Sequence, residues 1–72
     1  MENVYTVIDS KNHKCKVLNL VWNEATHSYS VYNVSKNNVE MRREFDSKKA
    51  FEQFLDERKE SGLIDNYYEV DM

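Results

Sequence analysis

The sequence predicts an α+β fold, an antiparallel three- to four-stranded sheet packed against one α-helix, with a C-terminal strand or arm. Three observations lead there. Apolar and polar residues alternate with a period of two in the first half, as in half-buried strands. A later segment repeats apolar residues at helical spacing. The 72 residues allow one core, so residues 1–72 should form a single small domain, with sheet 3–45, helix 47–61 and C-terminal strand or arm 63–71.

The first two strands are separated by a polar turn. Residues 4–8, VYTVI, are β-branched and aromatic, as suits a pleated surface. The cluster DSKNHK, residues 9–14, has turn composition, and a second strand is expected from Cys15 or Lys16 to Trp22.

The stretch WNEATHSYSV, residues 22–31, resembles the second hairpin of the immunoglobulin-binding domain of streptococcal protein G. The resemblance implies a loop with His27 at positive φ and a register that pairs Trp22 with Tyr29. One sheet face then carries Leu18, Leu20, Trp22, Tyr29 and Val31, and the other carries Val17, Val21, Tyr32 and Val34. A single helix covers one face only, so we expect additional cover over the other, by the tail, a second copy or a target.

Residues 39–45, VEMRREF, predict a further strand with one apolar and one charged face. Asn37 and Asn38 suit a two-residue turn with positive φ at both positions, and a four-residue loop is the alternative. Arg43 interrupts the apolar side, so we expect it near the sheet edge or with its stem along apolar surface.

The helix has clear start and stop signals. Asp46 or Ser47 is the expected N-cap, the body runs from Lys48 to about Ser61, and Gly62 ends it. Phe51 and Phe54 lie on the apolar face and are expected in the core. The tail LIDNYYEVDM, residues 63–72, can add a last strand that covers surplus apolar surface, or form an arm that orders on a partner.

Several kinds of chemistry are not expected. Gly62 is the single glycine, which leaves no phosphate-cradling loop, and no CxxC or HExxH spacing suggests a metal. We therefore expect no cofactor, no metal and no enzymatic activity. Cys15 is the single cysteine and is expected to be a small packing residue. Because no long apolar run is present, we expect a cytoplasmic protein with no membrane segment.

Charge is spread unevenly. Residues 1–49 carry eight Lys and Arg against six Asp and Glu, whereas residues 50–72 carry two against seven. Carboxylates at i, i+4 on the helix repel each other, and those near its C-terminus oppose its dipole. Arg58 and Lys59 could offset them on an ordinary solvated face. The functional interpretation is an acidic partner-binding face made of Glu52, Asp56, Glu57, Glu60, Asp65, Tyr67, Tyr68 and Glu69.

The expected function is therefore protein binding, by a small acidic regulator or inhibitor of the kind that a phage or mobile element uses to block a host factor. The expected partner is a basic-surfaced protein, or a second copy in a homodimer. Trp22, Tyr29 and Tyr32 on the sheet form the alternative partner-binding surface, because Tyr and Trp are enriched in binding hot spots.

DNA is the alternative partner. Residues 45–55, FDSKKAFEQFL, resemble the strand-to-helix junction of arm-type DNA-binding domains of tyrosine recombinases. The resemblance implies that the sheet face opposite the helix enters the major groove, with Lys16, Lys36 and Arg42, and also Lys14, as the candidate contacts. Phosphate binding needs several unopposed cations, and Glu40 and Glu44 flank Arg42, so DNA ranks behind a protein partner.

Overall fold

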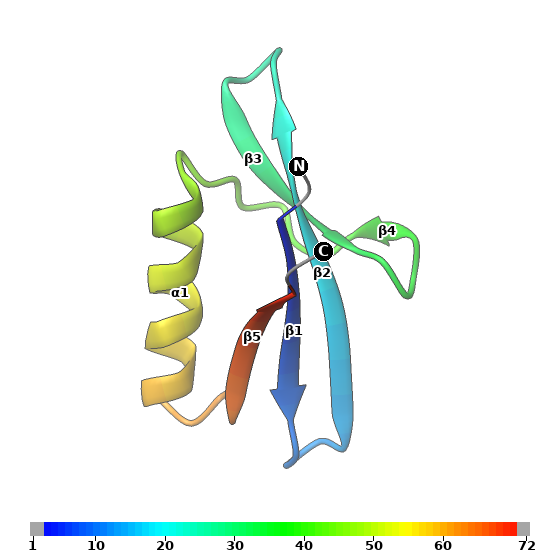
Figure 1. Ribbon diagram of the computed structural model, residues 1–72, viewed down its shortest axis with the longest axis vertical. Helices are drawn as coiled ribbons and strands as arrows, with labels where there is room; N and C mark the ends of the chain where they lie inside the picture. Colours follow the sequence, from blue (N-terminus) through cyan, green and yellow to red (C-terminus); the bar gives the residue numbers. More distant parts are fainter. Residues whose placement is uncertain (1–2, 71–72) are drawn as a thin grey trace.

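The computed structural model describes residues 3–70. It contains an antiparallel five-stranded sheet and one helix (Figure 1), which confirms the predicted α+β class. Along the sheet the strand order is β4-β3-β2-β1-β5. The elements are β1 (Asn3–Asp9), β2 (Lys14–Asn23), β3 (Ser28–Asn33), β4 (Asn38–Val39), α1 (Lys48–Glu60) and β5 (Asn66–Val70).

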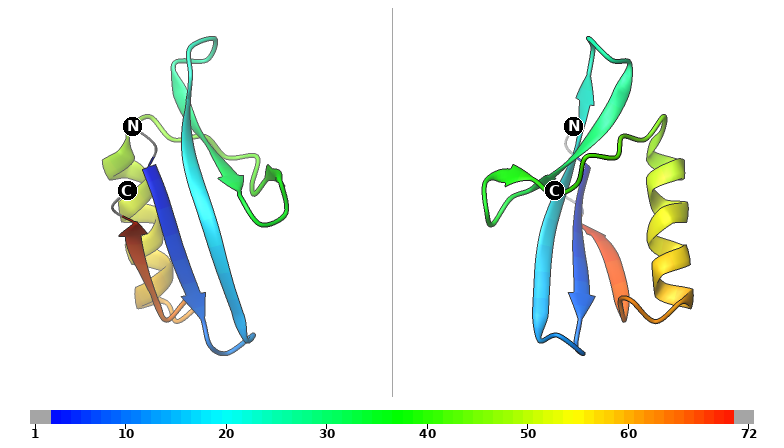
Figure 2. Two further views of the ribbon diagram at one scale, coloured as in Figure 1. Left: turned by 45° about the vertical axis from the view of Figure 1, so that its right-hand side comes forward. Right: turned by 180° about the vertical axis from the view of Figure 1, so that it is seen from behind.

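The C-terminal segment is a strand and not an arm. β5 pairs antiparallel with β1, with Thr6 opposite Tyr68 and Val4 opposite Val70. It widens the sheet by one edge strand, and its backbone groups form hydrogen bonds with those of β1. The expectation that the tail would cover surplus apolar surface was therefore wrong, because β5 lies in the plane of the sheet (Figure 2).

The β2–β3 hairpin has the predicted register. Trp22 lies opposite Tyr29, and Leu20 lies opposite Val31. Their strands are joined by a four-residue loop, in which His27 has φ 51° as expected. The rings of Trp22 and Tyr29 meet edge to face at 4.9 Å, an arrangement that stabilises the end of the hairpin.

The predicted strand over residues 39–45 is not continuous. Val39 lies opposite Tyr32, and the next pairing is an isolated bridge between Tyr29 and Phe45. Val39 and Phe45 are six residues apart, whereas their partners on β3, Tyr32 and Tyr29, are only three apart. The extra residues between Val39 and Phe45 therefore form a bulge. The bulge lets Met41 pack against the core. The alternative four-residue loop before β4 is the one observed, since Asn33 pairs with Asn38 and only Asn37 of the two asparagines has positive φ, 56°.

The helix begins and ends as predicted. The Ser47 Oγ accepts a hydrogen bond from the Ala50 amide at 3.1 Å, which caps the first turn. At the other end Gly62 has φ 81°, and the amide of Leu63 donates to the Arg58 carbonyl at 2.9 Å. This is a Schellman stop, which uses the tolerance of glycine for positive φ.

Aromatic rings fix α1 on one face of the sheet. Phe51 is fully buried, and its ring meets Tyr5 and Phe45 edge to face, each at 5.2 Å. Leu18, Leu20, Val31 and Leu55 complete the centre of this core. Phe54 is only partly buried, and the guanidinium groups of Arg43 and Arg58 lie over its ring at 5.1 and 4.4 Å. The expected apolar environment of the Arg43 side chain is thus provided by the rings of Phe45 and Phe54.

Truncation of Phe51 tests this core. Phe51→Ala should lower the free energy of unfolding by about 3–5 kcal/mol, because it removes a buried ring and leaves a cavity. That is a large share of the stability of a small domain. Gln53→Ala, at an exposed position of the same helix, is the control and should unfold like the wild type. Thermal and urea unfolding give the comparison, and equal stability of the two variants would contradict the proposed core.

Candidate functional site: the outer face of the sheet

The helix covers only one face of the sheet. Tyr5, Val7, Leu18 and Leu20 point toward α1 and belong to the buried core. Because side chains alternate along a strand, their neighbours point to the opposite side, which we call the outer face. In the left view of Figure 2 the helix lies behind β1 and β5, so this view looks toward the outer face.

No strand residue on the outer face is charged. The strand pairing places fifteen residues there, all apolar or neutral: Val4, Thr6, Ile8, Cys15, Val17, Asn19, Val21, Asn23, Ser28, Ser30, Tyr32, Val39, Asn66, Tyr68 and Val70. The charged residues of the described strands are Asp9, Lys14, Lys16 and Glu69, and all four point to the helix side. All charged residues of the described strands thus lie on the helix side of the sheet. A charge reaches the outer face from outside the strands, where the Glu44 carboxylate accepts a hydrogen bond from Ser28 at the hairpin end.

Large apolar side chains of the outer face are open to solvent. Val21 is 44% exposed, Tyr68 is 54% exposed and Val39 is 57% exposed. They come from a central strand and from both edges of the sheet, so the exposure extends across its width. This is the surplus apolar surface that the sequence predicted, and no described element covers it.

Asn19 is an unusual polar residue on the outer face. It lies on the central strand β2, between Val4 of β1 and Tyr32 of β3. Its Oδ1 is buried and has no hydrogen-bond partner in the part of the chain that the structure describes. An unsatisfied buried acceptor typically costs about 1–3 kcal/mol, so most native structures avoid one.

The predicted acidic face is largely occupied by contacts within the molecule. Glu52 accepts a hydrogen bond from the Tyr5 hydroxyl at 2.7 Å, and Asp56 accepts one from Tyr67 at 2.6 Å. Glu69 forms an ion pair with Lys48. These three contacts join α1 to β1 and β5, which gives the carboxylates a structural role.

The other residues predicted for this face are dispersed. The Asp65 carboxylate accepts a hydrogen bond from the Ser10 amide at 2.6 Å, and these contacts with Ser10 lower its pKa. Glu57 and Glu60 are exposed on the helix, whereas Tyr68 lies on the outer face. The eight residues do not form one continuous surface.

The three aromatic residues predicted as an alternative surface are also divided. Trp22 and Tyr29 point to the helix side, at the end of the hairpin, and Tyr32 lies on the outer face. The Tyr32 hydroxyl donates to Asn37 Oδ1 at 2.8 Å, which holds its ring beside the loop that precedes β4. Of the three rings, only Tyr32 belongs to the uncharged surface.

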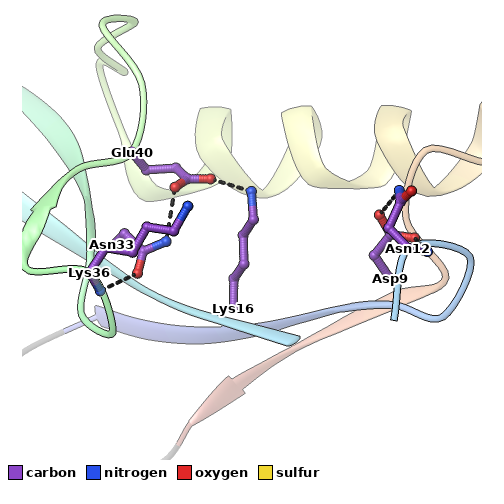
Figure 3. Close-up of polar contacts among 6 residues, drawn as sticks. All are labelled: Asp9, Asn12, Lys16, Asn33, Lys36 and Glu40. Carbon is purple, nitrogen blue, oxygen red and sulfur yellow. Dashed lines mark hydrogen bonds and ion pairs between the residues drawn. The ribbon is translucent and has the colours of Figure 1, made fainter. Parts of the chain in front are cut away.

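The candidate DNA-contacting lysine on β2 is bound by a carboxylate. Lys16 points to the helix side and pairs with Glu40 at 2.7 Å, and Asn33 also donates to Glu40 (Figure 3). Burial alone would raise the pKa of Glu40, but the hydrogen bonds from Lys16 and Asn33 hold it below its usual value. The expected placement of Lys16 opposite the helix was therefore wrong, because strand alternation sets it beside Leu18.

Lys14, Lys16 and Lys36 nevertheless meet around a shallow cavity of about 320 Å³, with His13 and Cys15. Lys36 lies here because its amide donates to the buried Asn33 at 3.0 Å (Figure 3). Arg42 is exposed on the bulge and does not line this cavity.

Cys15 is exposed, so its predicted packing role was wrong: it points to the uncovered face. Asp9 and Asn12 in Figure 3 bond to each other and close the neighbouring β1–β2 turn.

Residues 3–70 contain neither a metal-binding cluster nor a membrane-spanning helix. Within that range, no three or more His, Cys, Asp or Glu side chains gather closely enough to hold a metal ion. The one helix described there is too short and too polar to cross a membrane. Comparison of the chain with protein-family models, curated proteins and solved structures gave no match.

The contact between Tyr67 and Asp56 should change the pKa of the Tyr67 hydroxyl by an amount that can be measured. Its hydrogen bond, together with partial burial, raises the pKa of Tyr67 to about 12. In the unfolded chain the same group ionises near pH 10. Stability from this group is therefore present below about pH 10 and is lost as the pH rises to about 12.

Asp56→Asn should move the pKa of Tyr67 back toward about 10, because the charged acceptor is gone. The measurement is an NMR titration of the Tyr67 ring at alkaline pH. Glu57→Gln, an exposed position on the same helix, is the control and should leave this titration unchanged. An unaltered pKa in Asp56→Asn would show that the contact is not made in solution.

Proposed function

We propose that this chain is a small protein-binding regulator that contacts its partner through the outer face of its sheet. One observation carries the proposal. The chain has 32% charged residues, yet none of the fifteen strand residues on this face is charged. A regulator or inhibitor acts by occupying a surface of its target, for which one binding face is sufficient.

An uncharged, partly apolar face is costly to leave in water. Antiparallel sheets with one solvated face usually place polar and charged residues on it. The cores of protein interfaces, in contrast, are depleted of charge and enriched in aromatic residues. Val21, Val39 and Tyr68 fit the second pattern, since each exposes at least 44% of its surface.

The chemistry of this face also favours a particular class of partner. The described strands place no charged side chain on it, and the one carboxylate seen beside it, that of Glu44 at the hairpin end, is bonded to the Ser28 and Thr26 hydroxyls. The predicted acidic face has Glu52 and Asp56 engaged with tyrosine hydroxyls. A partner with an apolar surface of its own is therefore better supported than the basic-surfaced partner expected from the sequence.

DNA has weaker support. Binding driven by phosphate neutralisation needs several unopposed cations on the contacting surface. Lys16 pairs with Glu40 on the helix side. Lys14 and Lys36, the other two lysines of the shallow cavity, lie together at one corner of the sheet. The face opposite the helix, which the recombinase resemblance assigns to the major groove, has no cation on any described strand.

The double variant Val21→Lys with Tyr68→Lys tests the proposed face. Both positions are well exposed, so the variant should fold, but lysines there should disrupt an apolar interface. In quantitative affinity capture, we expect the variant to lose the wild-type partner by roughly tenfold or more. Glu57→Gln with Glu60→Gln is the matched control on the helix and should retain the partner.

The opposite pattern, with the partner kept by the lysine variant and lost by the glutamine variant, would contradict the proposal and return the function to the acidic helix. Thermal melting of each variant separates loss of binding from loss of folding. A gel-shift titration with duplex DNA tests the other class. Micromolar or tighter binding that Lys14→Ala with Lys36→Ala abolishes would establish DNA as the ligand.

A further inference from the structure

We infer that the occupant of the outer face is a second copy of this chain, so that two sheets stack face to face in a symmetric dimer. The inference rests on the proposed function and names the partner of the same face. It draws on the distribution of charge, on the size of the face and on the position of Asn19.

The charge distribution selects the outer face for self-association. In a dimer with two-fold symmetry the same patch meets itself, so any charge near the axis opposes a like charge. The chain has a net charge of −3, and its helix carries exposed charges such as Glu57 and Glu60. A contact through the helix would have to bury exposed charges of both signs, whereas the described strands place no charge on the outer face.

The size of the face is sufficient. Five strands spaced about 4.8 Å apart, and about six residues long at about 3.3 Å each, give a flat area of roughly 500 Å² per copy. Two copies together bury about 1,000 Å², which reaches the threshold for a specific interface. Interfaces of this size are at the lower end of the range and belong to weak or transient complexes, so we expect a dissociation constant on the order of micromolar or weaker.

The outer face is also suited to stacking. Sheets pack about 10 Å apart with their inner side chains interdigitated, and β-branched residues fill such a layer well. Thr6, Ile8, Val17 and Val21 form a run of this kind on the two neighbouring strands β1 and β2. The polar strand residues of this face are serine, threonine, asparagine, tyrosine and Cys15. All of them are uncharged, so none needs an opposite charge when the face is buried.

Asn19 supplies a polar contact at the centre. It lies on the middle strand of the sheet, and its Oδ1 has no hydrogen-bond partner among residues 3–70. On a two-fold axis, rotation of this amide toward the other copy pairs each Nδ2 donor with the opposite Oδ1 acceptor. The dimer thus satisfies the one described side-chain atom that is buried without a hydrogen bond.

Sedimentation equilibrium of the wild-type chain, at concentrations up to about 1 mM, tests the inference. We expect a monomer–dimer equilibrium. Val21→Lys with Tyr68→Lys should weaken it at least about 100-fold, since it places like charges across the interface. Gln53→Lys with Glu57→Gln, at two exposed helix positions, changes the net charge by the same +2, so it is the charge-matched control and should dimerise like the wild type.

Asn19→Asp gives a second variant that changes little in shape. It should weaken dimerisation at neutral pH, where two carboxylates face each other, and restore it below about pH 4, where they are protonated. The thiol of Cys15, exposed on the same face of the monomer, reports which surface is covered. Its reaction with a thiol reagent should slow as the dimer forms.

Other results would overturn the inference. A dimer that persists in the lysine variant, or whose formation leaves Cys15 equally reactive, uses another surface. A monomer at every concentration rules out the second copy as occupant. In that case the proposed protein-binding function still stands if the lysine variant loses a captured partner, and it fails as well if the variant loses nothing.

Discussion

The packing of one helix against one face of the sheet is the constraint on which the rest of the structure depends. Phe51 enters between Tyr5 and Phe45, and the Tyr5 hydroxyl at the edge of this cluster bonds to Glu52 on the same helix. Burial and this bond together raise the pKa of Tyr5 well above its usual range, which keeps the hydroxyl protonated as a donor. Once α1 is fixed there, the opposite face has no described element to cover it.

The charged side chains of the described strands also lie on the side of the sheet that faces the helix. Lys48 pairs with Glu69, Lys16 pairs with Glu40, and Asp56 accepts from Tyr67, all on the helix side or at the edge of the sheet. Carboxylates that form a repulsive stripe in the sequence thus become the links between α1 and its neighbouring strands. The same arrangement that makes these acidic residues structural leaves the described strands without a charge on the outer face, so contacts there depend on apolar and neutral polar side chains.

Local sequence signals predicted much of the fold. Trp22 and Tyr29 set the hairpin register, and Ser47 and Gly62 set the helix ends, because each acts through its near neighbours. The bulge after Val39 was missed, since it depends on where Met41 meets a distant core.

The candidate site was predicted only in part. Two apolar sheet faces were visible in the alternation of β2, and so was the need for cover. The lack of charge on the outer-face strands was also visible in the sequence, because every second residue from Val4 to Ile8 and from Cys15 to Asn23 is uncharged. The roles of Glu52 and Asp56 could not be predicted, because they depend on tyrosines 47 and 11 residues away along the chain.

The most direct test of the outer face as the binding surface is an isotope-filtered NOE experiment on a mixture of labelled and unlabelled chains. It detects contacts between copies and excludes those within one copy. We expect intermolecular NOEs from the methyl groups of Val17, Val21 and Val70, with none from Ala50 or Leu55 on the sheet-facing side of α1. Intermolecular NOEs that arise from helix residues while these valines show none would contradict it.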